Sequence, residues 1–94
     1  MTTELRATAA SIAASLPPDA VAIHDKPASE ATSEDYARHS EAFDPAYAFL
    51  AVIAEADSKA LRRAARRARG EAQHLAAALL SGAALRIEYP RTRD

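Results

Sequence analysis

Apolar residues near the start of the chain recur with the spacing of a helix. They occupy positions i, i+4, i+7, i+8 and i+11, which share one helical face: Leu5, Ala9, Ile12, Ala13 and Leu16. Pro17 and Pro18 follow directly, and a proline pair at this point cannot continue the helix. The pattern predicts a first helix that ends at these prolines.

Two short apolar runs indicate extended structure. Residues Ala20–His24 lie between turn-forming residues and predict a brief strand. Near the other end, Leu85, Ile87 and Tyr89 alternate with charged residues, which is the two-residue period of a half-buried strand. We expect the runs at 20–24 and 85–89 to pair with each other or across a dimer.

Helical signals dominate the chain between these runs. Ser33 is a suitable N-cap for a short helix that extends to about Phe43. Asp44 and Pro45 then supply the N-cap and first position of a new helix. The sequence therefore predicts two successive helices here, separated at Asp44-Pro45.

The second of these helices has the pattern to continue to Leu80, with Gly82 as its terminating glycine. A helix over residues 45–80 would be about 54 Å long. A compact chain of 94 residues has a radius of gyration of only about 12 Å. We therefore expect a break at Asp57-Ser58 or at Gly70, or else a protruding helix that meets a partner chain.

These elements predict a mainly α fold of three to four helices, with a long Ala-rich C-terminal helix and two short strands forming a minor β-pair. The chain 1–94 is expected to be a single small helical domain. Hydrophobic residues make up 49% of it, but only two are Phe and none is Trp. Because each of its many alanines buries little area, a second copy would add useful core, so we expect a homodimer.

Composition excludes several function classes. The chain has no cysteine, which excludes disulfides, thiolate chemistry and Cys-ligated metal sites. Its two glycines cannot form a P-loop or a dinucleotide fingerprint, so we expect no small-molecule cofactor. No window approaches the roughly 18 apolar residues of a membrane span, and no signal peptide is evident. We expect a cytoplasmic protein that does not contact a membrane.

Charge is divided between the two halves of the chain. Residues 19–57 contain nine acidic and two basic residues, whereas residues 58–94 contain nine basic and three acidic residues. The net formal charge is only −1. Such a polarised chain favours folding back on itself or pairing head to tail with another chain.

The basic half contains an arginine cluster that is the main candidate binding site. Its five members cover an arc of about 160° at 100° per residue; they are Arg62, Arg63, Arg66, Arg67 and Arg69. The opposite arc holds an apolar seam spaced 4-3-4-3-4, the candidate oligomer interface: Leu61, Ala65, Ala68, Ala72, Leu75 and Leu79. The cluster has three interpretations, which are a phosphate-binding face, a protein-binding face and a solvated face.

Other candidate chemistry is sparser. Arg69 and His74 form an R-x4-H pattern, which resembles the catalytic motif of HEPN-type ribonucleases. That resemblance implies an arginine and a histidine projecting from a helix and meeting their dimer mates to cleave RNA. His24 and His39 are separated from His74 without metal-ligand spacing, so no metal site is predicted. A carboxylate cluster is expected to be solvated charge rather than catalytic: Glu30, Glu34, Asp35, Glu41 and Asp44.

The sequence therefore favours a non-enzymatic protein-protein interaction module, acting through its polarised surface on another protein or on itself. Small regulatory or adaptor proteins, including phage-encoded ones, often have this size and composition. The alternative is a nucleic-acid-binding regulator that uses the basic helix at 62–69, and a third hypothesis is a dimeric HEPN-like ribonuclease. A basic face clear of the acidic segment would favour nucleic acid, while a neutralised one would favour protein pairing.

Overall fold

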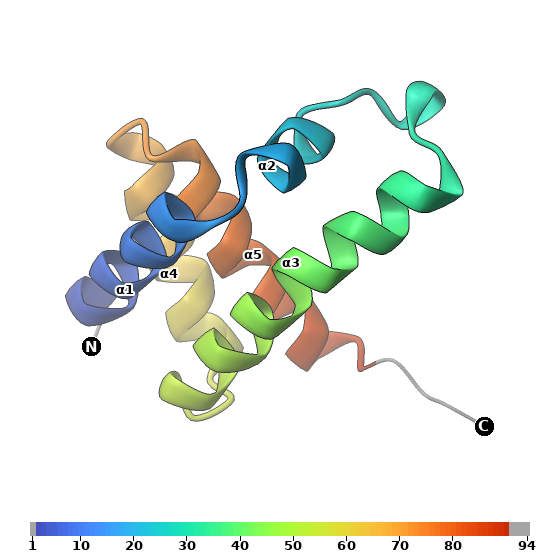
Figure 1. The fold of residues 1–94 in the computed structure, drawn as a ribbon. Helices are drawn as coiled ribbons and strands as arrows, with labels where there is room; N and C mark the ends of the chain where they lie inside the picture. The colour runs from blue at the N-terminus through green and yellow to red at the C-terminus, as the bar shows by residue number, and fades with distance from the viewer. Residues whose placement is uncertain (1, 91–94) are drawn as a thin grey trace.

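The computed structural model describes residues 2–90, and this part of the chain is mainly helical (Figure 1). The elements in chain order are α1 (Thr2–Ser15), α2 (Pro18–His24), the 3-10 turn η1 (Ala28–Glu30), α3 (Ser33–Ile53), α4 (Ser58–Gly70) and α5 (His74–Glu88). The predicted helical class is thus confirmed. The described residues form five α-helices rather than three or four, and they contain no strand.

The proline pair both ends α1 and begins α2. Pro17 is extended and precedes the first turn of α2, and Pro18 takes the first helical position, where its missing N–H costs nothing. The strand predicted at Ala20–His24 is therefore wrong. A short apolar run has no period that distinguishes a strand from a buried helical turn, and here Ala20 is the buried residue of α2.

α3 is one continuous helix, so the predicted restart at Asp44-Pro45 is wrong. It begins at a capping box in which Thr32 Oγ1 accepts from the Asp35 amide at 3.1 Å, and Asp35 accepts from the Thr32 amide at 3.0 Å. Pro45 lies on the exposed side of α3, where solvent can reach the carbonyl oxygen that a proline leaves unbonded.

The long helix predicted over residues 45–80 does not form, and the chain breaks at both of the places between which the sequence left the choice open. α3 ends before a turn in which Glu55 and Ala56 have φ of 53° and 60°, and α4 ends before Ala72, with φ of 62°. Asp57 caps α4, accepting from the Ala60 amide at 3.1 Å. The left-handed residues reverse the chain without any glycine, although this conformation is costly for residues with a Cβ.

α5 continues through two predicted boundaries. Gly82, expected to terminate a helix, lies inside α5, where a Cβ would overlap the ring of Tyr47. The strand predicted at Leu85–Tyr89 is also wrong, because the alternation there falls within the last turns of α5. Tyr89 follows the last residue of α5, and its amide donates to the Leu85 carbonyl at 2.8 Å.

The core is built mostly from alanine. Ten of the buried apolar residues in the described part are alanines, and the larger ones are Leu5, Phe43, Leu50, Leu61, Leu79 and Leu80. α4 packs on α5 and α1, and α5 also packs on α3. Small side chains permit close approach between these helices, so packing density compensates for the lack of bulky residues.

Most residues of the predicted apolar seam are buried against other helices of the same chain. Leu61, Ala65, Ala68 and Leu79 are buried, and Leu75 is partly buried against the same core. Ala72 is the exception, because it lies exposed in the α4–α5 turn after the helix has ended. Whether a second chain adds to this core stays a prediction.

Candidate functional site

Six cations form one surface along the outer side of α4, which we call the basic face: Lys59, Arg62, Arg63, Arg66, Arg67 and Arg69. The opposite side of the helix is buried, with Leu61, Ala64, Ala65 and Ala68 facing α1 and α5. At about 100° per residue Lys59 falls between Arg63 and Arg66, so it completes the face. The arginine cluster predicted from the sequence omits Lys59, although the same helical projection finds it.

One arginine of this face has a carboxylate partner. Arg62 donates to Glu88 on α5, with Nη2 2.6 Å from Oε1. This hydrogen bond raises the pKa of Arg62 and lowers the pKa of Glu88. The other five cations of the face make no ion pair with any side chain that the structure describes.

The basic face carries a cost in helix stability. α4 contains no acidic residue, and its cations stand three or four residues apart, the spacing at which side chains on a helix interact. Each like-charged pair destabilises a helix by about 0.2–0.5 kcal/mol. Arg67 and Arg69 gain some compensation from the negative end of the helix dipole. An ordinary solvated face mixes charges of both signs, and this one does not.

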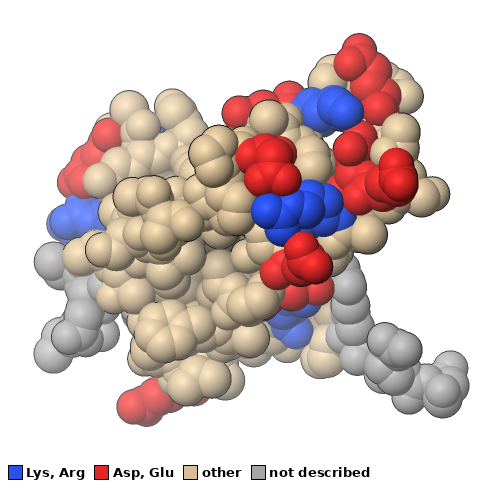
Figure 2. All heavy atoms as spheres, viewed as in Figure 1, with Lys and Arg blue, Asp and Glu red and all other residues tan. Residues whose placement is uncertain are grey.

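The acidic residues gather elsewhere, over α2, η1 and the first half of α3. Figure 2 shows many carboxylates on one side of the molecule, with basic side chains among them, and other carboxylates at separate edges. α2 packs on α3, whereas α4 does not pack closely on either element in the described part. The basic face of α4 and this acidic surface are therefore separate in space.

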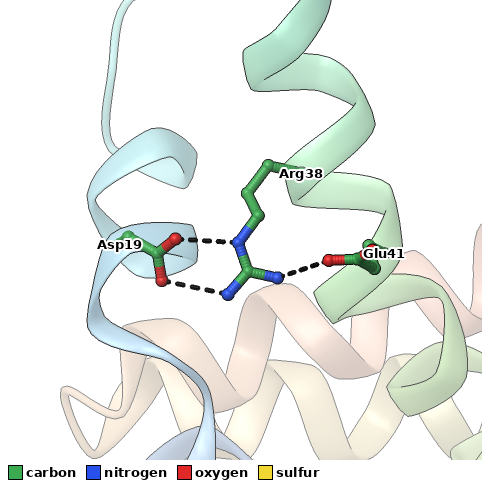
Figure 3. Close-up of polar contacts among 3 residues, drawn as sticks. All are labelled: Asp19, Arg38 and Glu41. Atoms are coloured by element: carbon green, nitrogen blue, oxygen red, sulfur yellow. Dashed lines mark hydrogen bonds and ion pairs between the residues drawn. The ribbon is translucent and has the colours of Figure 1, made fainter.

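Two cations tie the acidic surface together. Arg38 donates to Asp19 on α2 through Nε at 2.7 Å and Nη2 at 3.1 Å, and to Glu41 at 2.7 Å (Figure 3). These bonds lower the pKa of Asp19 and raise the pKa of Arg38. Lys26 donates to Asp35 at 2.8 Å and, with the Thr32 amide, lowers its pKa. The arginine cluster takes no part in neutralising this surface.

A second candidate site lies between α3 and α5 and was not predicted. It is a cavity of about 440 Å³, which we call the tyrosine cavity, lined by Tyr36, His39, Ser40, Asp44, Tyr47, Gly82, Leu85, Arg86 and Tyr89. Arg86 pairs with Asp44 at 2.6 Å and lies 5.0 Å from the centre of the Tyr47 ring. The sequence gives no signal for this cavity, because α3 and α5 lie far apart along the chain.

Beside the tyrosine cavity, two histidines stack with an aromatic residue of the core. The rings of His39 and Phe43 are nearly parallel with centres 4.0 Å apart, and His24 Nδ1 lies 3.2 Å from His39 Nε2. Burial, followed by the proximity of His24, lowers the pKa of His39, while Asp44 opposes the shift. The described residues contain no group of three or more side chains arranged to hold a metal ion.

The R-x4-H pair is split between two helices. Arg69 lies at the end of α4 and His74 is the first residue of α5, with the turn at 71–73 between them. Both side chains are exposed. The resemblance to HEPN-type ribonucleases implied one helix carrying both residues, and the structure does not have that arrangement.

Comparison with known proteins identified no relative of this chain. No family model, curated protein or solved structure matches the chain. No helix in the described part is long and apolar enough to cross a membrane.

Proposed function

We propose that this protein is a non-enzymatic nucleic-acid-binding protein that holds the phosphate backbone on the basic face of α4. The observation that carries the proposal is the set of exposed cations without carboxylate partners among the described residues, namely Lys59, Arg63, Arg66, Arg67 and Arg69. Arginine binds phosphate oxygens with two parallel hydrogen bonds, and its charge is permanent.

The composition of the basic face favours phosphate over a protein partner. The exposed residues of α4 are all cations apart from Gly70 at the helix end. Protein interfaces gain most of their affinity from a few central hot spots, mainly Trp, Tyr and Arg, and the centre is otherwise depleted of charged residues. Nucleic-acid interfaces instead gain much of theirs from phosphate neutralisation and counterion release. A face with no apolar anchor suits the second kind of partner.

The segregated charges also support an oriented encounter. A molecule with a net charge of −1 has no overall attraction to a polyanion. Its basic face and its distant acidic surface would nevertheless turn the molecule so that α4 meets the phosphates. We expect binding independent of sequence, because phosphate contacts position a protein without reading bases.

Salt titration tests this proposal directly. The five cations of the basic face that have no carboxylate partner among the described residues should contribute up to about −4.5 to the slope of log K against log salt on duplex DNA, at about −0.9 per neutralised phosphate. Replacing Arg63 and Arg67 by Gln should weaken binding and reduce the slope by about 0.9 for each phosphate that is no longer neutralised. Gln keeps high helix propensity, so α4 should remain folded.

A matched control removes the same charge elsewhere. Replacing Arg6 and Arg38 by Gln lowers the net charge equally, but both arginines pair with carboxylates and neither belongs to the basic face. The control should keep the slope of the wild-type protein. Equal affinity for duplex DNA in the two double variants would show that the basic face is only a solvated surface.

A second candidate function, protein–protein interaction, is favoured by exposed apolar residues on α3. Phe49 and Val52 are 52% and 72% exposed, and Ile53 beside them is 39% exposed. Contiguous exposed apolar patches mark interaction sites, and we propose a second copy of this chain as the occupant. Sedimentation of the wild-type protein and of Phe49→Glu at micromolar concentration tests this, with a monomer expected only for the variant.

A further inference from the structure

At the tyrosine cavity, α3 and α5 are held together by a packing contact of Tyr47 and by the ion pair of Asp44 with Arg86. Tyr47 lies against Gly82, where the absence of a Cβ lets the ring approach the α5 backbone. Next to it, Asp44 and Arg86 link the two helices through their ion pair. Beyond that pair the helices leave a space of about 440 Å³, which is within the size range of small-ligand sites.

The chemistry of the cavity suits a planar, uncharged ring with polar edges. All three tyrosines of the chain line it, and Tyr36 and Tyr89 are 56% and 72% exposed at its edge. Aromatic faces of this kind stack on nucleobases of any identity. Arg86 is already engaged by Asp44 and by the Tyr47 ring, so its charge is compensated. Ser40 and His39 add hydrogen-bonding groups for a polar ring edge.

The cavity adjoins the basic face. Arg62 reaches from α4 to Glu88 on α5, the residue immediately before Tyr89. A chain of phosphates on α4 would therefore pass beside the cavity opening, with a base within reach of Tyr89.

We propose that the tyrosine cavity receives an unpaired base of a single-stranded nucleic acid whose phosphates lie on the basic face. This inference rests on the function proposed above and narrows its substrate class. A base inside a duplex is paired and stacked, and extruding it costs free energy. The cavity therefore gives single strands an interaction that duplexes do not make.

Oligonucleotide binding by the full chain tests the proposal. The probes are oligo(dT), oligo(U), an abasic strand of equal length, and duplex DNA, at one salt concentration. Tyr89→Ala and Tyr36→Ala should each weaken binding of oligo(dT) or oligo(U) by about 5- to 150-fold, the range for removal of one stacking ring. Neither variant should weaken binding of the duplex or of the abasic strand. Comparing the affinities for oligo(dT) and oligo(U) also shows whether the protein prefers DNA or RNA.

Intrinsic fluorescence gives a second measurement on the same samples. The chain has no Trp, so its emission comes from the three tyrosines that line the cavity. Oligo(dT) should change this emission, whereas the abasic strand and the duplex should not. His74→Ala removes an exposed ring from outside the cavity and is the matched control, with wild-type affinity expected for every probe.

The outcomes separate this inference from the proposed function. If single strands and abasic strands bind equally and the tyrosine variants match the wild-type protein, the cavity proposal is overturned while phosphate binding on α4 stands. If the wild-type protein binds none of the four probes, both proposals are overturned. Loss of affinity for every probe in Tyr89→Ala would indicate a general structural effect and would also count against a base site.

Discussion

Replacing Arg66 should stabilise the protein while it weakens binding. Arg66 is exposed on α4, and three cations surround it at helical spacing, with Arg62 and Arg63 before it and Arg69 after it. Each like-charged pair costs about 0.2–0.5 kcal/mol. Arg66→Gln removes three such pairs and should increase the free energy of unfolding by about 0.6–1.5 kcal/mol. Arg66→Glu turns them into attractions and should give up to about twice that gain.

Thermal denaturation followed by circular dichroism measures this effect. For a domain of this size, 1 kcal/mol corresponds to a rise in Tm of about 4–8 °C. The gain should be largest at about 10 mM salt and small at 1 M, because the Debye length falls from about 30 Å to about 3 Å. Affinity for nucleic acid should change in the opposite direction, decreasing from Arg to Gln to Glu.

A control arginine should behave differently. Arg38 pairs with Asp19 and Glu41, so Arg38→Gln removes attractions and should not stabilise the protein. If Arg66→Glu is no more stable than the wild-type protein at low salt, or if its gain persists at 1 M salt, the cations of α4 do not repel one another as described. The basic face would then carry no cost in stability.

Three further predictions concern the fold. Thr32→Ala removes the capping box of α3 and should lower the free energy of unfolding by about 1 kcal/mol in urea titrations. Leu79→Ala should cost about 2–5 kcal/mol because Leu79 is fully buried, while Leu75→Ala should cost clearly less at its partly exposed position. Burial lowers the pKa of His39 below its usual 6.5, so the unfolded chain takes up the proton more readily. Stability should therefore decrease as the pH falls through about 6.5, and His39→Gln should reduce that decrease in denaturation curves recorded between pH 8 and 5.

The spacing of apolar residues correctly predicted the helices that bury only one face. In α1, Leu5 and Ala9 are buried as their spacing required, and in α4 the arginines and the apolar residues lie on opposite sides as expected. A break at Asp57-Ser58 or at Gly70 was one of two alternatives that the sequence left open, the other being a protruding helix, and the structure has a break at both places. Such elements are predictable because one buried stripe repeats over several turns.

Short elements and long-range packing were not predictable in this way. The strands predicted at Ala20–His24 and Leu85–Tyr89 rested on a few apolar residues, which fit the period of a strand and of a helix equally well. In the folded chain tertiary packing favours the helical conformation. The role of Gly82 depends on Tyr47, which belongs to a different helix. The tyrosine cavity likewise requires the position of α5 beside α3, which no local pattern encodes.

The alanine packing of α4 against α5 restricts how this sequence can evolve. Ala64, Ala65 and Ala68 on one helix, and Ala76 and Ala83 on the other, are all buried. Any larger residue at these positions adds atoms to a closely packed interface, at about 1–3 kcal/mol, and glycine loses about 1 kcal/mol of helix propensity. Neither a larger nor a smaller residue is therefore tolerated at these positions. Mutations that survive selection should accumulate on the outer faces of the same helices, so descendants of this chain would keep the spacing of α4 and α5 while their surface charge diverges.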